Sequence, residues 1–259
     1  MRIVPLIKLN LPLLLLQALL YVAAPAVAQD QGDDAEIAAI RALLAATQPG
    51  MEVRDVVLSP LGLYEVGIQN GQTIYVSRDA KYLIPGDLYE AKAEGLVNLG
   101  EARRNVIRRE RIAALDEADM IVFEPEGQRK ATLTVFTDVD CPYCRKLHAE
   151  IEALNGYGIA VRYLAFPRTG LNTETHAKMV STWCADDRKA MLTSAKRGGD
   201  VPPLECDNPV ANQYQLGREV GVTGTPALVF EDGTIMPGYV EAATLAQYLL
   251  GDDTQETQP

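Results

Sequence analysis

The stretch FTDVDCPYCRKLH, residues 136–148, constrains the fold of this 259-residue chain more than any other. Cys141 and Cys144 follow an apolar, strand-like run and stand at the start of a helical pattern. Pro142 suits the first position of a helix, where no backbone N–H is needed. A strand that ends in Cys-x-x-Cys and opens a helix is typical of thiol–disulfide exchange sites. The stretch therefore predicts a redox-active pair of thiols in an α/β domain.

The start of the predicted helix favours a thiolate at Cys141. Unpaired backbone N–H groups and the positive end of the helix dipole lie beside that residue. In such motifs the cysteine pKa falls from about 8.5 into the range of ~3.5 to 7.5. Because the thiolate is the attacking species, we expect Cys141 to be the nucleophile. We expect Cys144, nearly one turn further on, to be the more buried, resolving thiol.

Two other interpretations of this pair remain open. A zinc site would need two more ligands, but Cys184 and Cys206 lack the close paired spacing of zinc ribbons. His148 and His176, the only histidines, form no recognisable ligand pair. A purely structural bridge between neighbouring thiols would close a very small loop and stabilise the fold little. We therefore expect neither a metal nor another cofactor.

Residues 1–28 predict a cleaved signal peptide. Arg2 and Lys8 give a positive start, residues 9–22 are almost wholly apolar, and Ala26–Ala28 fit a small-x-small cleavage site. Cleavage would take the formal net charge from −11 to −13, because it removes two bases and no acid. Such an acidic surface argues against nucleic acid and anionic membranes as partners. Export would place the four cysteines in an oxidising compartment, where disulfides persist.

Residues 29–97 predict a small N-terminal domain. A helix is expected within 29–47, and residues 51–85 predict an antiparallel sheet with an Asn70-Gly71 hairpin. This sheet is small for independent stability, so a partner is expected to complete it. The alternative is that it packs on the second domain of its own chain.

Residues 98–119 predict a linker helix, which leads into a second domain at 120–252 and a flexible tail at 253–259. Arginines leave this helix only a narrow apolar stripe, which suits a bridge between domains and equally an ordinary surface helix. The second domain is predicted as a βαβ unit with a helical insertion, followed by ββα. Its expected strands are 131–138, 158–166, 226–230 and 234–240, and its expected helical segments are 142–155, 171–197, 209–219 and 242–250.

A second motif, GVTGTPALVF at 221–230, places Pro226 at the start of a strand. Together with FTDVDCPYCRKLH, WCADD, ECDNP, EDGTIMPGY, SPLGLYEV and YLIPGDLY, it makes the chain resemble the periplasmic thiol–disulfide isomerases of the DsbC/DsbG family. The resemblance covers nearly the whole chain after residue 28. It implies an α+β protein with a small β-rich dimerisation domain, a linker helix and a C-terminal thioredoxin-like α/β domain with a helical insertion.

The resemblance also implies roles for individual residues. Cys141 attacks substrate disulfides, Cys144 resolves the mixed disulfide, and Cys184–Cys206 takes the position of a structural disulfide. The residues expected to hold substrate backbone beside the reactive pair are Tyr143, Gly224, Thr225 and a cis Pro226. The implied partners are a second copy of the chain, misfolded exported proteins with disulfides, and a membrane reductase of the DsbD type, all in the periplasm.

The chain departs from the family pattern in places. Its Pro-Tyr dipeptide between the cysteines matches the DsbG branch, while its second cysteine pair is closer to DsbC, so the balance of isomerase and reductase activity stays open. Val135 stands where thioredoxins carry a buried acid. Asp138 and Asp140 are the nearest acids, and we expect capping or solvation for them, above all for Asp140. His148 is expected on the helix surface.

The combined expectation is an exported disulfide isomerase and reductase. Two alternatives remain at this point. One is a holdase-type chaperone whose thiols are secondary, and the other is a monomeric dithiol oxidase.

Overall fold

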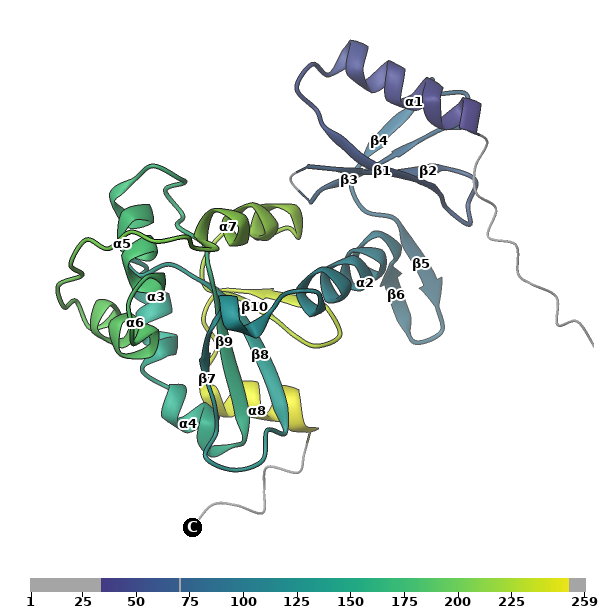
Figure 1. The fold of residues 1–259 in the computed structure, drawn as a ribbon. Coiled ribbons are helices and arrows are strands. Elements are labelled where there is room, and N and C mark those ends of the chain that lie inside the picture. The colour runs from purple at the N-terminus through teal and green to yellow at the C-terminus, as the bar shows by residue number, and fades with distance from the viewer. Residues whose placement is uncertain (1–33, 70, 252–259) are drawn as a thin grey trace, which may run out of the picture. The chain divides into compact units, whose positions relative to one another are not determined.

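The computed structural model describes residues 34–69 and 71–251 (Figure 1). The predicted signal peptide and the predicted tail at 253–259 lie outside the described residues. Among the residues that are described, no helix has the length and apolar character needed to cross a bilayer.

The N-terminal part is a helix packed on a four-stranded antiparallel sheet, which confirms the sheet predicted for residues 51–85. Ile40 and Leu44, one turn apart on the helix, are fully buried against Tyr64, Val66 and Val76 of the sheet. The elements, whose strands lie side by side in the order of their numbering, are α1 (Asp34–Thr47), β1 (Val53–Leu58), β2 (Tyr64–Ile68), β3 (Thr73–Val76) and β4 (Leu83–Pro85).

A separate hairpin, β5 (Tyr89–Lys92) with β6 (Gly95–Asn98), follows the sheet and was not predicted. Both residues between the strands and most of the strand residues themselves are exposed. Strand β5, YEAK, alternates apolar and polar side chains over only four residues, and β6, GLVN, does not alternate, so the pattern is too short to indicate a hairpin. Gly95 adopts φ +136°, a backbone conformation that favours glycine.

Helix α2 (Leu99–Ala113) covers most of the predicted linker. Asn98 caps its first turn by accepting a hydrogen bond from the Glu101 N–H at 2.9 Å. The expected helix over 98–119 is too long, because Asp116 accepts from the Ala118 N–H and begins a separate 3-10 turn, η1 (Glu117–Asp119).

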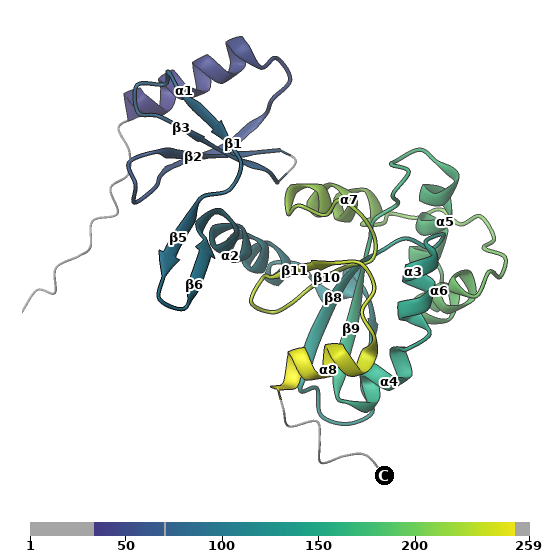
Figure 2. The ribbon, with the colours of Figure 1, turned by 180° about the vertical axis from the view of Figure 1, so that it is seen from behind.

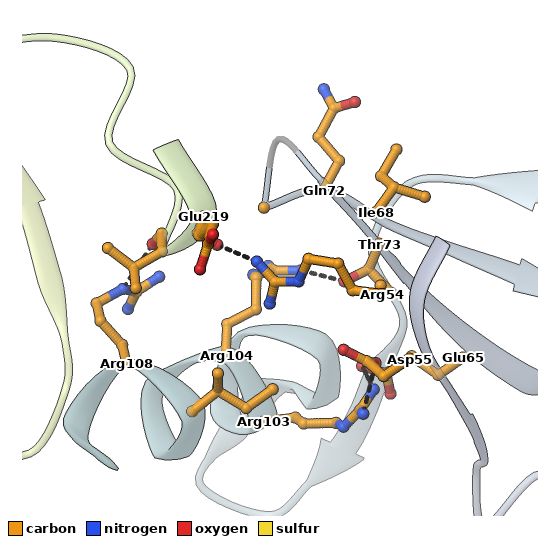
Figure 3. Close-up of a pocket in the computed structure, with 14 residues that line it drawn as sticks. Arg54, Asp55, Glu65, Ile68, Gln72, Thr73, Arg103, Arg104, Arg108 and Glu219 are labelled. Atoms are coloured by element: carbon orange, nitrogen blue, oxygen red, sulfur yellow. Dashed lines mark hydrogen bonds and ion pairs between the residues drawn. The ribbon is translucent and has the colours of Figure 1, made fainter. Parts of the chain in front are cut away.

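The arginines of α2 give this polar helix its contacts. Arg103 pairs with Asp55 at 2.7 Å and with Glu65 at 3.2 Å, and Arg104 donates to the Thr73 hydroxyl at 3.1 Å (Figure 3). The two ion pairs attach α2 to strands β1 and β2, and the hydrogen bond attaches it to β3. The packing of α2 therefore depends on these charged side chains as well as on its narrow apolar stripe.

Arg108 joins α2 to the end of helix α7 (Val210–Glu219) and to the turn between strands β10 (Ala227–Val229) and β11 (Ile235–Pro237). It is 2% exposed and donates to the backbone oxygens of Val220 at 2.9 Å and Gly233 at 2.5 Å, and to Asn105 Oδ1 at 2.6 Å. Gly233 has φ +87°, and a Cβ atom there would stand 1.9 Å from the backbone oxygen of Asn105. Only glycine therefore allows the turn to approach the helix this closely.

The C-terminal part is built on a five-stranded sheet in the order β11-β10-β8-β9-β7. Strands β8 and β9 run parallel, and the other neighbouring pairs are antiparallel. Short strand β7 was not predicted, while the other strands confirm the sequence-based expectation. The strands are β7 (Ile121–Phe123), β8 (Ala131–Thr137), β9 (Ile159–Ala165), β10 (Ala227–Val229) and β11 (Ile235–Pro237).

Helices cover this sheet, with α4 and α8 side by side and α3 packed against α6 (Figure 1, Figure 2). The insertion predicted as helical over 171–197 is divided into α5 and α6. The helices are α3 (Pro142–His148), α4 (Ile151–Gly156), α5 (Glu174–Trp183), α6 (Arg188–Lys196), α7 (Val210–Glu219) and α8 (Ala242–Leu250).

The helix predicted over 142–155 is broken between α3 and α4. Glu150 at the break leaves helical geometry, with φ −102° and ψ 10°. Its carboxylate accepts from the Ala242 N–H at 2.6 Å and from the Tyr239 hydroxyl. Glu150 thus satisfies a free N–H at the start of α8, a tertiary contact that the local sequence does not reveal.

A disulfide joins Cys184, at the end of α5, to Cys206 in the loop before α7. The two residues are 22 positions apart, with their Cα atoms 5.7 Å from one another. In the chain-entropy description, closing a loop of this size stabilises the fold by about 3 kcal/mol.

Replacing Arg108 with methionine should lower the free energy of unfolding by roughly 3 kcal/mol, because two buried backbone oxygens lose their donor. Urea denaturation followed by circular dichroism measures this change. Arg109→Met, on the exposed side of the same helix, is the matched control and should change stability by less than about 0.5 kcal/mol. Equal effects of the two substitutions would show that the buried hydrogen bonds contribute nothing.

Candidate functional site

Strand β8 and helix α3 place the two reactive cysteines. All seven residues of β8 are buried, and the strand ends at Thr137, four residues before Cys141. Cys141 is the N-cap residue of α3 in an extended conformation, and Pro142 takes the first helical position. The predicted position of Cys141 at a helix start is confirmed.

Cys141 and Cys144 are free thiols, and both residues are buried, with exposures of 1% and 0%. Cys144 is the more deeply buried of the two, as the sequence led us to expect, and burial is the largest influence on its pKa. Tyr143 between them is 64% exposed, so the dipeptide itself lies on the surface above two sheltered sulfurs.

The loop before β10 closes the site from the other side. The Thr225–Pro226 peptide bond is cis, and the Cys141 sulfur lies 3.2 Å from the backbone oxygen of Thr225, to which it donates when it is protonated. The Pro226 oxygen accepts from the Gly238 N–H at 2.8 Å. A Cβ atom added to Gly224 would meet open space, so the backbone of this loop is accessible beside the sulfur. The structure thus brings together Cys141 and the loop 224–226, which lie far apart in the sequence.

The surroundings of Cys141 favour its thiolate. A hydrogen bond from the Cys144 thiol is the largest cause, followed by the Thr225 hydroxyl, the Cys144 N–H and the charge of Arg168, and against partial burial these lower the pKa of Cys141 to about 5. The Thr225 hydroxyl is buried, and no other group among the described residues hydrogen-bonds to it. It is therefore able to donate a hydrogen bond to the Cys141 sulfur.

Cys144 has the opposite character. Burial, and then its hydrogen bond to Cys141, raises the pKa of Cys144 above its ordinary value. The Thr137 hydroxyl and the Asp138 N–H act in the other direction by hydrogen-bonding to this sulfur. At neutral pH the pair therefore consists of a thiolate at Cys141 and a protonated thiol at Cys144.

The two acids near the pair have different roles. Asp138 is 1% exposed, and its carboxylate accepts from the Asp140 N–H at 2.8 Å and from the backbone and side chain of Arg168 at 2.8 and 3.2 Å. Neither expected role fits Asp138, because its carboxylate is buried and closes the turn before α3, whose N-cap Cys141 has no side-chain cap. Asp140 accepts from the Thr175 hydroxyl at 2.8 Å and pairs with Lys178 at 3.4 Å, so it ties the active-site loop to α5.

The expectation that His148 lies on the helix surface is wrong. The residue is 7% exposed, and its ring nitrogens lie 3.1 Å from the Tyr163 hydroxyl and 3.0 Å from the Thr193 hydroxyl. Burial, with the nearby charges of Lys196 and Arg197, lowers the pKa of His148 to about 4, so the ring is neutral at pH 7. The helical insertion packs α6 over this face of α3, which the sequence pattern of α3 alone does not reveal.

Sequence reasoning missed two charged residues near the sulfurs. Arg168 follows β9, and its positive charge interacts with the Cys141 sulfur. Lys196 ends α6 and interacts electrostatically with the sulfurs of both Cys141 and Cys144. Neither residue belongs to a recognisable motif. Val135, at the position of the acid in thioredoxins, is fully buried. Because its side chain is apolar, no carboxylate at this position can act on Cys144.

The residues around Cys141 and Cys144 do not form a metal-binding cluster. In the part of the chain that the structure describes, no group of three or more histidine, cysteine or acidic residues is arranged to hold one. The pocket in Figure 3 is lined by arginines and acids of α2 and its neighbours, and none of its lining residues is a cysteine.

Comparison with known proteins covers both parts of the chain. Residues 28–101 match the family model described as the disulfide bond isomerase protein N-terminal domain, and residues 117–250 match that of the thioredoxin-like domain. A thiol:disulfide interchange protein DsbC from Dickeya dadantii is 40% identical over 190 residues, which are 73% of this chain and 77% of that protein. DsbC from Escherichia coli K12 is 36% identical over 219 residues, or 85% and 88% of the two chains.

A solved structure of a disulfide interchange protein from Neisseria gonorrhoeae is 32% identical, with a TM-score of 0.46. The alignment covers 52% of this chain and 98% of that one.

Alkylation of the reduced protein should reveal the low pKa of Cys141. The rate of its reaction with iodoacetamide, followed by mass spectrometry, is expected to rise with pH around a midpoint of about 5, while Cys144 stays unmodified at neutral pH. A midpoint near the ordinary value of about 8.5 would contradict the thiolate.

The lowered pKa of Cys141 also makes the stability of the reduced protein depend on pH. Because the pKa of Cys141 is lower in the folded than in the unfolded chain, thiolate formation stabilises the reduced fold fully above about pH 8.5. This stabilisation is expected to decrease as the pH falls from there to about 5. Denaturation of Cys141→Ser over the same pH range provides the comparison.

Proposed function

Because this chain belongs to the DsbC family of thiol:disulfide interchange proteins, we propose that its disulfide isomerase activity is carried by Cys141 as the attacking thiol and Cys144 as the resolving thiol. The observation that supports these roles best is the contrast between the two sulfurs. The pKa of Cys141 is lowered to about 5 and that of Cys144 is raised, so one thiol of the pair is ionised and poised to attack.

The proposed reaction starts with the Cys141 thiolate attacking one sulfur of a substrate disulfide. A bond forms between Cys141 and that sulfur, the substrate disulfide breaks, and the second substrate sulfur leaves as a thiolate. If another substrate thiolate attacks the mixed disulfide, the substrate is released with a new pairing and Cys141 is regenerated. If Cys144 attacks instead, the substrate leaves reduced and a Cys141–Cys144 disulfide forms.

Substrate backbone is proposed to lie along the loop before β10. Gly224 leaves open space over its Cα atom, and the cis bond before Pro226 presents the Thr225 backbone next to the Cys141 sulfur. An extended peptide could add to this loop through backbone hydrogen bonds, which read no particular sequence. Tyr143, being exposed, would contact side chains on either side of the substrate cysteine. Such contacts suit an enzyme that accepts many misfolded proteins.

A second copy of the chain is proposed to cover the apolar edge of the N-terminal sheet. Strand β4 lies at this edge and is exposed throughout, with no charge in its sequence LIP. Uncovered edge strands of this kind invite pairing with another chain. Exposed apolar side chains near this edge, in the β1–β2 turn and in the β5–β6 hairpin are Leu61, Tyr82, Leu83, Ile84, Tyr89 and Leu96.

The proposed setting is the periplasm. The pattern at residues 1–28 supports export and cleavage, and DsbC relatives support a compartment in which exported proteins form disulfides. An isomerase needs Cys141 as a thiolate, so the pair must be returned to the reduced state after each turnover that ends in a Cys141–Cys144 disulfide. A membrane reductase of the DsbD type is the proposed electron donor.

Serine variants separate the proposed roles. Cys141→Ser should reduce the refolding of a scrambled, multi-disulfide ribonuclease to the uncatalysed rate, because no thiolate remains to attack. Cys144→Ser should keep part of the isomerase activity, lose reductase activity and accumulate mixed disulfides visible by non-reducing electrophoresis. The double variant Cys184→Ser/Cys206→Ser is the control and should keep a reactive Cys141. Full activity of Cys141→Ser would exclude it as the nucleophile.

Ile84→Lys tests the proposed dimer. Burial of this side chain in a two-fold interface would be lost twice, at about 1.5 to 3 kcal/mol each, so the dissociation constant should rise by about 100-fold or more. Sedimentation equilibrium measures the change. Val106→Lys, on the exposed surface of α2, is the matched control. A wild-type chain that is monomeric at all concentrations would overturn the dimer.

A further inference from the structure

Lys196 lies buried behind the reactive cysteines and has no part in the chemistry described so far. It ends α6 and is 4% exposed, although lysine is almost never fully buried without partners. Its Nζ atom donates to the Thr137 hydroxyl at 2.6 Å and to the Asp138 backbone oxygen at 2.8 Å. Both partners belong to the end of β8 and the residue after it, directly before the active-site loop.

The same two residues act on Cys144. The Thr137 hydroxyl and the Asp138 N–H both favour its thiolate, and so oppose the rise in the pKa of Cys144. Thr137 is fully buried, so its hydroxyl has these neighbours in place of water. The Thr137 hydroxyl therefore links the surroundings of Cys144 to Lys196, whose Nζ atom lies 2.6 Å from the hydroxyl oxygen.

We propose that Lys196 is a positioning residue for the resolving step, in which it takes up, through the Thr137 hydroxyl, the proton that leaves the Cys144 thiol. This inference rests on the proposed roles of Cys141 as nucleophile and Cys144 as resolving thiol. It goes beyond them because it explains how a buried thiol whose charged form is disfavoured becomes able to attack.

The step balances without any external oxidant. Before it, Cys141 is bonded to a substrate sulfur, Cys144 is a thiol and Lys196 is a neutral amine. The Cys144 proton passes to the Thr137 oxygen while the hydroxyl proton of Thr137 passes to Nζ, which becomes an ammonium. The Cys144 sulfur then bonds to the Cys141 sulfur, the bond from Cys141 to the substrate breaks, and the substrate leaves as a thiolate. The Cys144 sulfur is oxidised and the substrate sulfur is reduced.

The charges around Lys196 suit this timing. Burial lowers the pKa of Lys196 to about 8, so that amine and ammonium are both accessible near neutral pH. The Cys141 thiolate acts in the opposite direction and raises that pKa. Once Cys141 is held in a mixed disulfide, its negative charge is gone, and the pKa of Lys196 should fall further. The lysine is therefore expected to become a stronger candidate for the neutral amine at the moment when a base is needed.

Other titratable groups face this region but do not offer the same path. The groups that bear on Lys196 are Asp138 after β8, Cys141, Cys144, Arg145 and His148 on α3, and Tyr163 on β9 beyond His148. The Asp138 carboxylate is held by the Asp140 N–H and by Arg168. The ring of His148 is occupied by the hydroxyls of Tyr163 and Thr193. Lys196 is thus the base that hydrogen-bonds to Thr137, the residue through which it can act on Cys144.

A single-turnover measurement tests the proposal. The reduced protein is mixed with excess oxidised glutathione, quenched with acid at successive times, and the mixed disulfide on Cys141 is followed by mass spectrometry as it converts to the Cys141–Cys144 disulfide. The first-order rate of this conversion is measured from pH 5 to about pH 10, a range that spans the ordinary pKa of cysteine near 8.5.

In Lys196→Met, which keeps the length of the side chain, the resolving rate at pH 7 should fall by about 10-fold or more and approach the wild-type rate only at alkaline pH. Thr137→Val should behave in the same way, because it keeps the shape and removes the hydroxyl, while Thr137→Ser should retain the wild-type profile. Lys189→Met, on the exposed face of α6, is the matched control.

Each result bears on the inference. A shifted pH profile in both Lys196→Met and Thr137→Val, with Thr137→Ser unaffected, supports the relay and could not arise from a purely structural role. If Lys196→Met does not fold, the Thr137 pair decides alone. Unchanged pH profiles overturn the relay and leave the roles of the cysteines intact. If the wild-type protein forms no mixed disulfide on Cys141, the proposed function fails as well, so the two failures are distinguishable.

Discussion

The buried strand β8 sets the positions of the two reactive cysteines and of the loop before β10. Its seven residues are hydrogen-bonded to β9 on one side and partly to β10 on the other, so its end cannot shift without breaking both ladders. The chain leaves β8 to form the start of α3 with Cys141, while β10 brings the cis bond before Pro226 to the same place. The 3.2 Å contact between Cys141 and Thr225 is thus held by sheet pairing rather than by a flexible loop.

From this arrangement the two cysteines acquire opposite properties, although they are only three residues apart. Cys141 stands at the first turn of the helix, where donors converge on its sulfur, whereas Cys144 faces the interior, where charge is disfavoured. The interior is nevertheless not wholly apolar. Lys196, brought from the helical insertion to the end of β8, places an amino group 2.6 Å from the Thr137 hydroxyl, close to the buried thiol. The insertion therefore contributes to the chemistry of the site as well as covering the sheet.

Local patterns in the sequence were sufficient for much of the fold. The strand before Cys141, the helix after it and the hairpin at Gly71 follow from composition and turn chemistry over a few residues. The features that could not be predicted depend on residues distant in the chain. Glu150 breaks a helix because its carboxylate caps α8, His148 is buried because α6 covers it, and Lys196 meets the site only after the insertion has folded back. No window of neighbouring residues contains these contacts.

The disulfide between Cys184 and Cys206 means that one chain carries two pairs of sulfur atoms which have to remain in opposite redox states in the same solution. The physical reason lies in the stability of the free thiolate. Reduction of a Cys141–Cys144 bond releases an anion that the fold already favours, and such low-pKa thiols are good leaving groups. Reduction of Cys184–Cys206 would instead open a loop that the bond holds closed. One reductant can therefore reduce a Cys141–Cys144 disulfide while the Cys184–Cys206 disulfide stays intact.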